Sequence, residues 1–88
     1  MASEAISYEC FDGLIASLRD DGLSTEADRL YVLLHKVAWT TGSELIGELG
    51  QALKKIEKEA LPTISANSEQ KIEDCFKMVY RVWPDFPR

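Results

Sequence analysis

The chain has little of the chemistry that most enzymes and metalloproteins use. Its 88 residues include one histidine and two cysteines. Cys10 and Cys75 lie far apart in the sequence, with no CxxC pair and no histidine near either, so a zinc site or a redox motif is not supported. Two buried thiols are the simpler interpretation, and a bridge between the first and last helices is the alternative. We expect no catalytic residue, no metal and no cofactor.

Long apolar runs are also missing. Uninterrupted apolar segments, such as residues 31–34, cover only a few positions, whereas a membrane-spanning helix needs about 20. The first residues contain Glu4 and Glu9, where a signal peptide would have a basic and then an apolar region. We therefore expect a cytoplasmic protein that makes no contact with a membrane.

Apolar residues at helical spacing occur along almost the whole chain. Hydrophobic residues make up 45% of the composition, and they recur at i, i+3, i+4 and i+7. Gly22 is typical of a helix end, Ser24 of a helix start, and Asn67 or Ser68 of a later start. The predicted helices cover approximately residues 3–20, 24–39, 44–61 and 68–83.

The connection between the second and third predicted helices has two interpretations. Residues 41–44 fit the capping box that begins a new helix, which predicts a turn. Leu34, Ala38 and Gly42 keep helical spacing across the same stretch, which predicts one long helix. The first interpretation gives an all-α antiparallel bundle of about four helices in a single domain, residues 1–88. The second gives a long central helix with two flanking helices. Such a helix is about 50 Å long, which is more than the two flanking helices can cover in a monomer, so this chain would have to dimerise.

Small and aromatic residues suggest two further contacts. Gly47 and Gly50 lie inside the third predicted helix, where each costs about 1 kcal/mol relative to alanine, so we expect them to let another helix approach closely. The last residues, 83–88, contain two prolines and cannot be regular. We expect Trp83 to lie in the core and Phe86 to pack back onto the helices.

Charge is distributed unevenly along the chain. The net charge is −5, and the first 44 residues hold eight acidic and three basic side chains, whereas the remainder holds seven of each. A field of this sign repels nucleic acid and can steer a basic protein. We expect the partner to be another protein or a second copy of the chain, and not a nucleic acid.

Two kinds of residue form the candidate partner-binding surface. One kind is acidic: a cluster lies around the connection between the first and second predicted helices, and a pair lies four positions apart on one face of the third. Such acidic residues can raise the rate of association with a basic protein. Aromatic residues near helix ends dominate interface energies when they are exposed. The candidates are Asp20, Asp21, Glu26, Asp28, Trp39, Glu44 and Glu48.

Residues 34–50 resemble a group of short bacterial all-helical proteins of unknown function. The Ala-Trp-Thr-Thr stretch followed by Ser-Glu-Leu carries the resemblance, and Val82-Trp83-Pro84 is a second match. The resemblance implies a bacterial helical protein and brings no activity, cofactor or binding residue with it.

Size, charge and missing chemistry together predict a non-enzymatic binding protein. An immunity protein or antitoxin that blocks a basic toxin with its acidic N-terminal half would have these properties. The alternative is a structural or regulatory homodimer, whose apolar surface around Trp39 and the glycines of the third helix is covered by its own copy.

Overall fold

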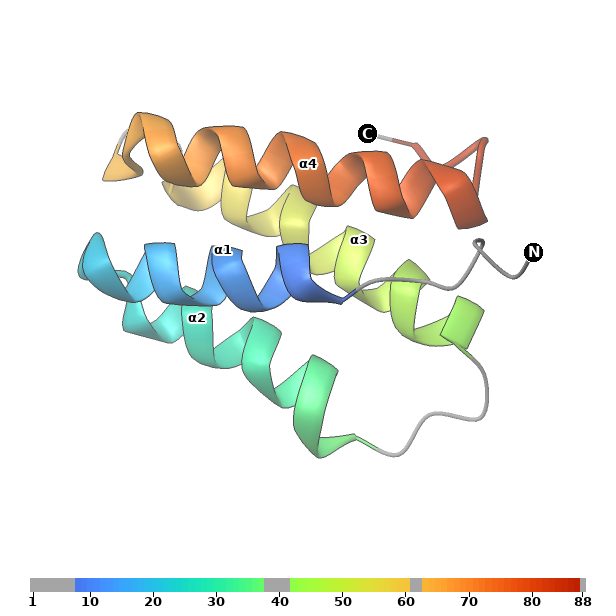
Figure 1. Cartoon of the computed structure of the whole chain (residues 1–88), viewed down its shortest axis with the longest axis horizontal. Coiled ribbons are helices and arrows are strands. Elements are labelled where there is room, and N and C mark those ends of the chain that lie inside the picture. Colours follow the sequence, from blue (N-terminus) through green and yellow to red (C-terminus); the bar gives the residue numbers. More distant parts are fainter. Residues whose placement is uncertain (1–7, 38–41, 61–62, 88) are drawn as a thin grey trace.

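The computed structural model of the chain describes residues 8–37, 42–60 and 63–87. In these residues the chain is helical without strands, and four α-helices pack against each other as a small bundle (Figure 1). This confirms the predicted fold class. A π-helical turn, η1 (Val32–Lys36), continues the second helix. The α-helices are α1 (Glu9–Asp20), α2 (Ser24–Tyr31), α3 (Gly42–Ala60) and α4 (Ala66–Val82).

The helix ends use some of the predicted signals and replace others. Gly22 has a φ of 81°, the left-handed conformation that ends α1 as predicted. The start of α4 was predicted wrongly, because Asn67 and Ser68 lie inside the helix. Its cap is Ser65, which has an extended backbone and whose hydroxyl accepts from the N–H of Ser68 at 3.1 Å. Ser24 is likewise the first residue of α2 and not its cap.

The long central helix is not formed. In η1 the N–H of Val37 donates to the carbonyl of Val32, five residues earlier, at 3.2 Å. Val37 then has an extended backbone, with φ −93° and ψ 135°, and α3 begins at Gly42. An extended residue cannot continue a helix. The alternative of one continuous helix is therefore wrong, although residues 38–41, and Trp39 with them, lie outside the described residues.

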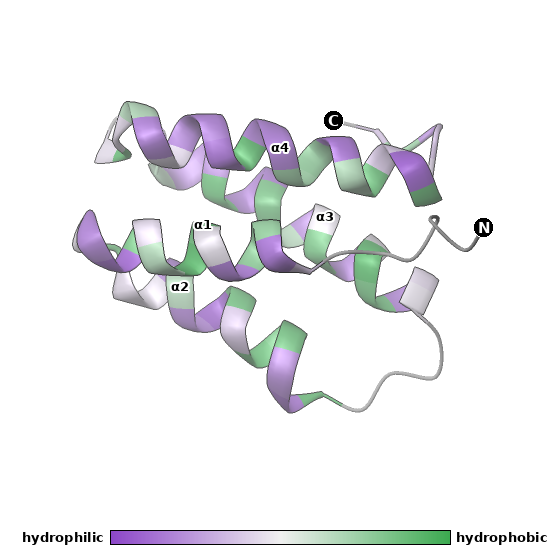
Figure 2. Cartoon of the chain, viewed as in Figure 1, coloured by the Kyte–Doolittle hydropathy of each residue, from purple (hydrophilic) through white to green (hydrophobic). Residues whose placement is uncertain are grey.

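The core contains most of the predicted apolar stripe of each helix, but Tyr31 and Val37 of the second predicted stripe and Trp83 of the fourth are exposed. Figure 2 shows hydrophobic and hydrophilic residues alternating along each helix, as amphipathic helices require. The packing is uneven, because α2 and η1 diverge from α1 toward the end of η1 (Figure 1), and η1 contributes no buried residue. The largest fully buried side chains are Phe11, Leu14, Leu18, Leu30, Ile46, Leu49, Leu53, Ile56, Ile72, Phe76 and Val79.

Candidate functional site

Among the described residues, three of the four exposed large apolar side chains lie where α2 passes into η1 and just after it. Tyr31, Val32 and Val37 are 39%, 47% and 40% exposed, so three large apolar side chains within seven residues face solvent. Single exposed apolar residues are ordinary, whereas a group of them marks a contact surface. The π-helical turn supports this interpretation, since such turns are frequent at functional sites.

A groove adjoins these residues between α2–η1 and α3. Its volume is ≈ 530 Å³, and we call it the α2–α3 groove. Val32, Leu33 and Ala52 supply its apolar part. The polar residues that line it are Thr25, Asp28, Arg29, Glu48, Gln51 and Lys55.

The α2–α3 groove brings together two of the predicted partner-binding residues. Asp28 comes from α2 and Glu48 from α3, and both line the groove. Asp28 also pairs with Arg19 of α1 at 2.8 Å. On the same wall, Arg29 lies 3.7 Å from Glu59. The groove therefore combines apolar residues with charged residues of both signs.

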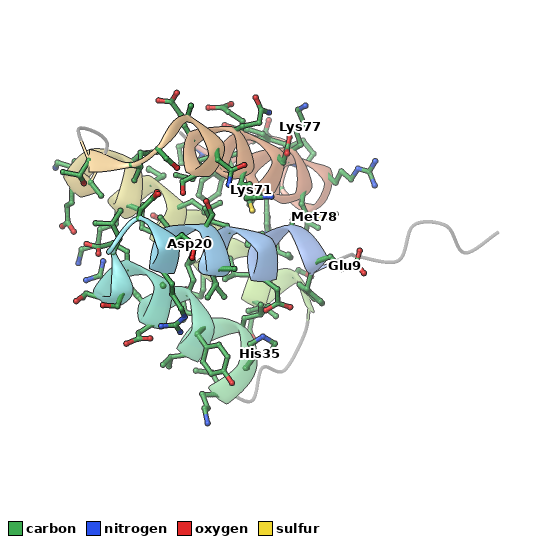
Figure 3. All side chains as sticks on the ribbon, turned by 60° about the vertical axis from the view of Figure 1, so that its left-hand side comes forward. Glu9, Asp20, His35, Lys71, Lys77 and Met78 are labelled. Atoms are coloured by element: carbon green, nitrogen blue, oxygen red, sulfur yellow. The ribbon has the colours of Figure 1, made fainter. Side chains whose placement is uncertain are left out.

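His35 fixes the position of η1 against α1. Its Nε2 lies within hydrogen-bond distance of Oδ1 of Asp12, at 2.7 Å, and its ring centroid is 4.8 Å from that of Tyr31. Figure 3 shows His35 at the η1 end of the molecule. The hydrogen bond holds η1 while Val32 in it and Val37 just after it stay exposed.

Asp21 has a different role from the one that its charge predicts. Its Oδ2 accepts hydrogen bonds from the hydroxyl of Ser68 at 2.6 Å and from the N–H and hydroxyl of Ser65, both at 3.1 Å. These bonds, chiefly that of Ser68, lower the pKa of Asp21 because they favour the charged carboxylate. Asp21 therefore ties the end of α1 to the start of α4.

The remaining candidates are spread over three helices. Asp20 is exposed at the end of α1 (Figure 3), Glu26 is half-buried in the first turn of α2, and Glu44 is exposed in the first turn of α3. Trp39 lies outside the described residues. The structure thus divides the predicted set, with Asp28 and Glu48 at the groove and Asp21 in a structural network.

A second groove, of ≈ 380 Å³, lies between α3 and the C-terminal residues 83–87, and it shares Glu48 and Gln51 with the first. Trp83 lies at this groove and its Nε1 donates to the carbonyl of Ser43 at 2.8 Å. Because Trp83 is 44% exposed, the predicted core position is wrong. α4 ends at Val82, because Pro84 disfavours helix in the residue before it, and Trp83 is thus left at the end of the bundle.

The glycines of α3 give these C-terminal residues room. A Cβ on Gly50 would lie 2.7 Å from Phe86 and 3.1 Å from Val79 of α4, so the expected close approach of another helix is confirmed there. A Cβ on Gly47 would lie 3.4 Å from Trp83, so the group that comes close to Gly47 is an aromatic ring that follows α4 and not a helix. Phe86 also packs on the rings of Phe76 and Tyr80, as predicted.

Gly50→Ala is expected to displace Phe86, because the new methyl group would overlap the ring. Gly47→Ala is the matched control and should stabilise α3 by up to about 1 kcal/mol, since alanine is the better helix former. Urea unfolding and proton NMR contacts between Phe86 and Val79 provide the measurements. In a Phe86→Ala background, Gly50→Ala should be much less destabilising, since only the 3.1 Å approach to Val79 remains. Equal stabilities and unchanged Phe86 contacts in the two single variants would contradict this packing.

Comparison with protein-family models, with curated proteins and with solved structures finds no match to this chain. Within residues 8–37, 42–60 and 63–87, no group of three or more His, Cys, Asp or Glu side chains is placed to hold a metal ion. In the same part of the chain, no helix has both the length and the apolar composition needed to cross a membrane. With no related protein for comparison, the role of the α2–α3 groove is argued from its lining residues and its geometry alone.

Proposed function

We propose that this chain is a non-enzymatic protein-binding module that binds a basic protein through the α2–α3 groove and the exposed residues of η1. The observation that carries the proposal is the exposure of Val32, at 47%, in a groove that Asp28 and Glu48 also line, with Val37, 40% exposed, five residues later in the chain. Apolar residues within a polar rim have the usual anatomy of a protein interface.

The two kinds of residue make different contributions to binding. Burial of the exposed valines against a partner supplies affinity. The acidic excess lies in the first 44 residues, which include α2 and η1, one wall of the groove. Such a field raises the association rate with a basic protein more than it deepens affinity. An immunity protein or antitoxin that covers a basic toxin is one kind of protein that works in this way.

A structural or regulatory homodimer is the second candidate. The α2–α3 groove carries Asp28 and Glu48 together with Arg29 and Lys55, so the two signs of charge are present on one surface. In a two-fold symmetric dimer the same surface meets itself, and such a surface can be self-complementary. This function gives the acidic excess no docking role.

Photo-crosslinking from position 32 tests the proposal. A benzophenone amino acid in place of Val32 should form adducts with a basic protein in an extract of the cells that make the chain. The matched control carries the same amino acid in place of Gln70, an exposed residue of α4, and should form none. Adducts with the chain's own copy would support the homodimer instead. Equal yields at the two positions would contradict both functions.

Charge variants separate steering from apolar contact. Asp28→Asn with Glu48→Gln should lower the rate of adduct formation several-fold at low salt and have little effect at high salt. Glu69→Gln with Asp74→Asn removes the same charge from exposed positions of α4 and should leave the rate unchanged. Light scattering across a concentration range then distinguishes a monomer that needs a partner from a tight dimer.

A further inference from the structure

Helices α1 and α4 are held together at two levels. Near one end, the hydroxyl oxygens of Ser17 and Ser68 lie 2.6 Å apart. Cys10 precedes Ser17 by seven residues and Cys75 follows Ser68 by seven, and the two helices run antiparallel (Figure 1). Equal steps of about two turns along each helix therefore place the cysteines opposite each other. Each thiol is the main influence on the pKa of the other, which agrees with this placement.

The two thiols have different surroundings. Neither is in a disulfide, and Cys75 is buried whereas Cys10 is partly exposed as the second residue of α1. The hydrogen bond from Cys75, helped by backbone N–H groups at the start of α1, lowers the pKa of Cys10. The same bond and burial raise the pKa of Cys75. Lys71, one turn before Cys75, reaches α1, where its Nζ would lie 3.7 Å from a Cβ on Gly13 (Figure 3).

We propose that Cys10 and Cys75 form a redox site, at which a hydroperoxide converts the two thiols into an intramolecular disulfide that joins α1 to α4. A partly exposed thiol that lies opposite a second, buried thiol on the neighbouring helix is the arrangement that this reaction requires. The site contains none of the residues that line the α2–α3 groove, so the inference does not depend on the proposed function.

The reaction has two steps. The Cys10 thiolate attacks the terminal oxygen of the hydroperoxide, the O–O bond breaks, and the departing alkoxide or hydroxide takes a proton from water. Cys10 is then a sulfenic acid. The sulfur of Cys75 attacks the sulfur of Cys10, the S–S bond forms, and the hydroxyl group leaves as water with the proton of Cys75. Two thiols lose two electrons in total and one hydroperoxide is reduced.

The disulfide would join α1 to α4 at the end of the helix pair that the serine network does not connect. Ser17, Ser68 and Asp21 join the C-terminal end of α1 to the N-terminal end of α4. Cys10 is in the first turn of α1, and helix ends open at low free-energy cost, which gives the two sulfurs freedom to close to bonding distance. A thiol reductant reverses the reaction.

The experiment treats the reduced full-length chain with hydrogen peroxide, removes the peroxide, and then blocks remaining thiols with N-ethylmaleimide in denaturant, so that the buried Cys75 is accessible to the reagent. We expect two modified cysteines before oxidation and none after it, an intact mass lower by two hydrogen atoms, and a tryptic product that joins the Cys10 and Cys75 peptides. The unfolding temperature should rise by at least about 5 °C and return when dithiothreitol is added. Two cysteines still modified after oxidation, or disulfides between separate chains, would overturn the proposal.

Single variants test the order of the steps. In Cys75→Ala the oxidation should stop at a sulfenic acid on Cys10, which dimedone traps, whereas in Cys10→Ala the buried Cys75 should react at least about tenfold more slowly. Cys75→Ser provides a second variant of the buried position. Equal rates for the two remaining thiols in folded variants would overturn the assignment of Cys10 as the attacking group, and the mass change in the native chain tests the disulfide independently.

Discussion

Phe76→Ala is expected to lower the free energy of unfolding by about 3 to 5 kcal/mol, because it removes a large buried ring and leaves a cavity. Phe76 is 1% exposed, and its ring centroid lies 6.3 Å from those of Tyr80 and Phe86. A domain of this length buries only about 60 to 65% of its unfolded surface, and total stabilities are about 5 to 15 kcal/mol. The variant should therefore be close to unfolding, as urea titration followed by circular dichroism will show.

Val32→Ala is the control for Phe76→Ala. Val32 is 47% exposed in η1, and a surface truncation changes stability by less than about 0.5 kcal/mol. A loss at Val32 comparable to the loss at Phe76 would contradict the structure, because it would mean that η1 is packed in the free chain. It would also remove the basis of the proposed binding surface.

Ser68→Ala is expected to cost about 1 to 3 kcal/mol, which is large for the removal of one hydroxyl group, because its partners in the network lose a hydrogen bond in a buried place. Ser68 is 0% exposed, and its hydroxyl lies 2.6 Å from Oγ of Ser17 and 2.6 Å from Oδ2 of Asp21. Ser24→Ala, at an exposed position of α2, is the matched control and should be near neutral. Similar losses at the two serines would contradict the network.

An acid titration checks the same serine network independently. Asp21 has a lower pKa in the folded chain than its ordinary value of about 3.9. Its contribution to stability is therefore complete above that value and is lost as the pH falls through the lower folded pKa. In Ser68→Ala the pKa of Asp21 should move back toward the ordinary value, and carbon NMR of the carboxyl group measures this directly.

The helices were predictable because the signals that define them are local. Leu14 and Leu18 of α1 both face the core because residues four positions apart lie on the same face of a helix. Gly22 ends α1 because glycine readily adopts a positive φ. The π-helical turn was not predicted, since nothing in the spacing of residues 31–37 distinguishes it from an α-helix. The cap of α4 was misplaced by two or three residues, because Asn67, Ser65 and Ser68 are all good caps.

The candidate site was predictable only in part. The chemistry of Asp28 and Glu48 could be recognised, but their meeting at one groove depends on how α2 lies against α3. Asp21 has the same side chain as its neighbour Asp20, yet only Asp21 is in reach of Ser65 and Ser68. The matching seven-residue spacings of serine and cysteine in α1 and α4 were a signal that could have paired Cys10 with Cys75.

The sequence by itself determined that the chain is helical, where most helices begin and end, and that its negative charge lies in the first half, because periodicity, capping and composition act over a few neighbouring residues. Only the tertiary structure decided that Asp21 is a structural residue, that Val32 and Val37 stay exposed, and that Cys10 and Cys75 lie opposite each other on α1 and α4. Each of these depends on the register and angle between helices distant in sequence, which spacing within a single helix does not specify.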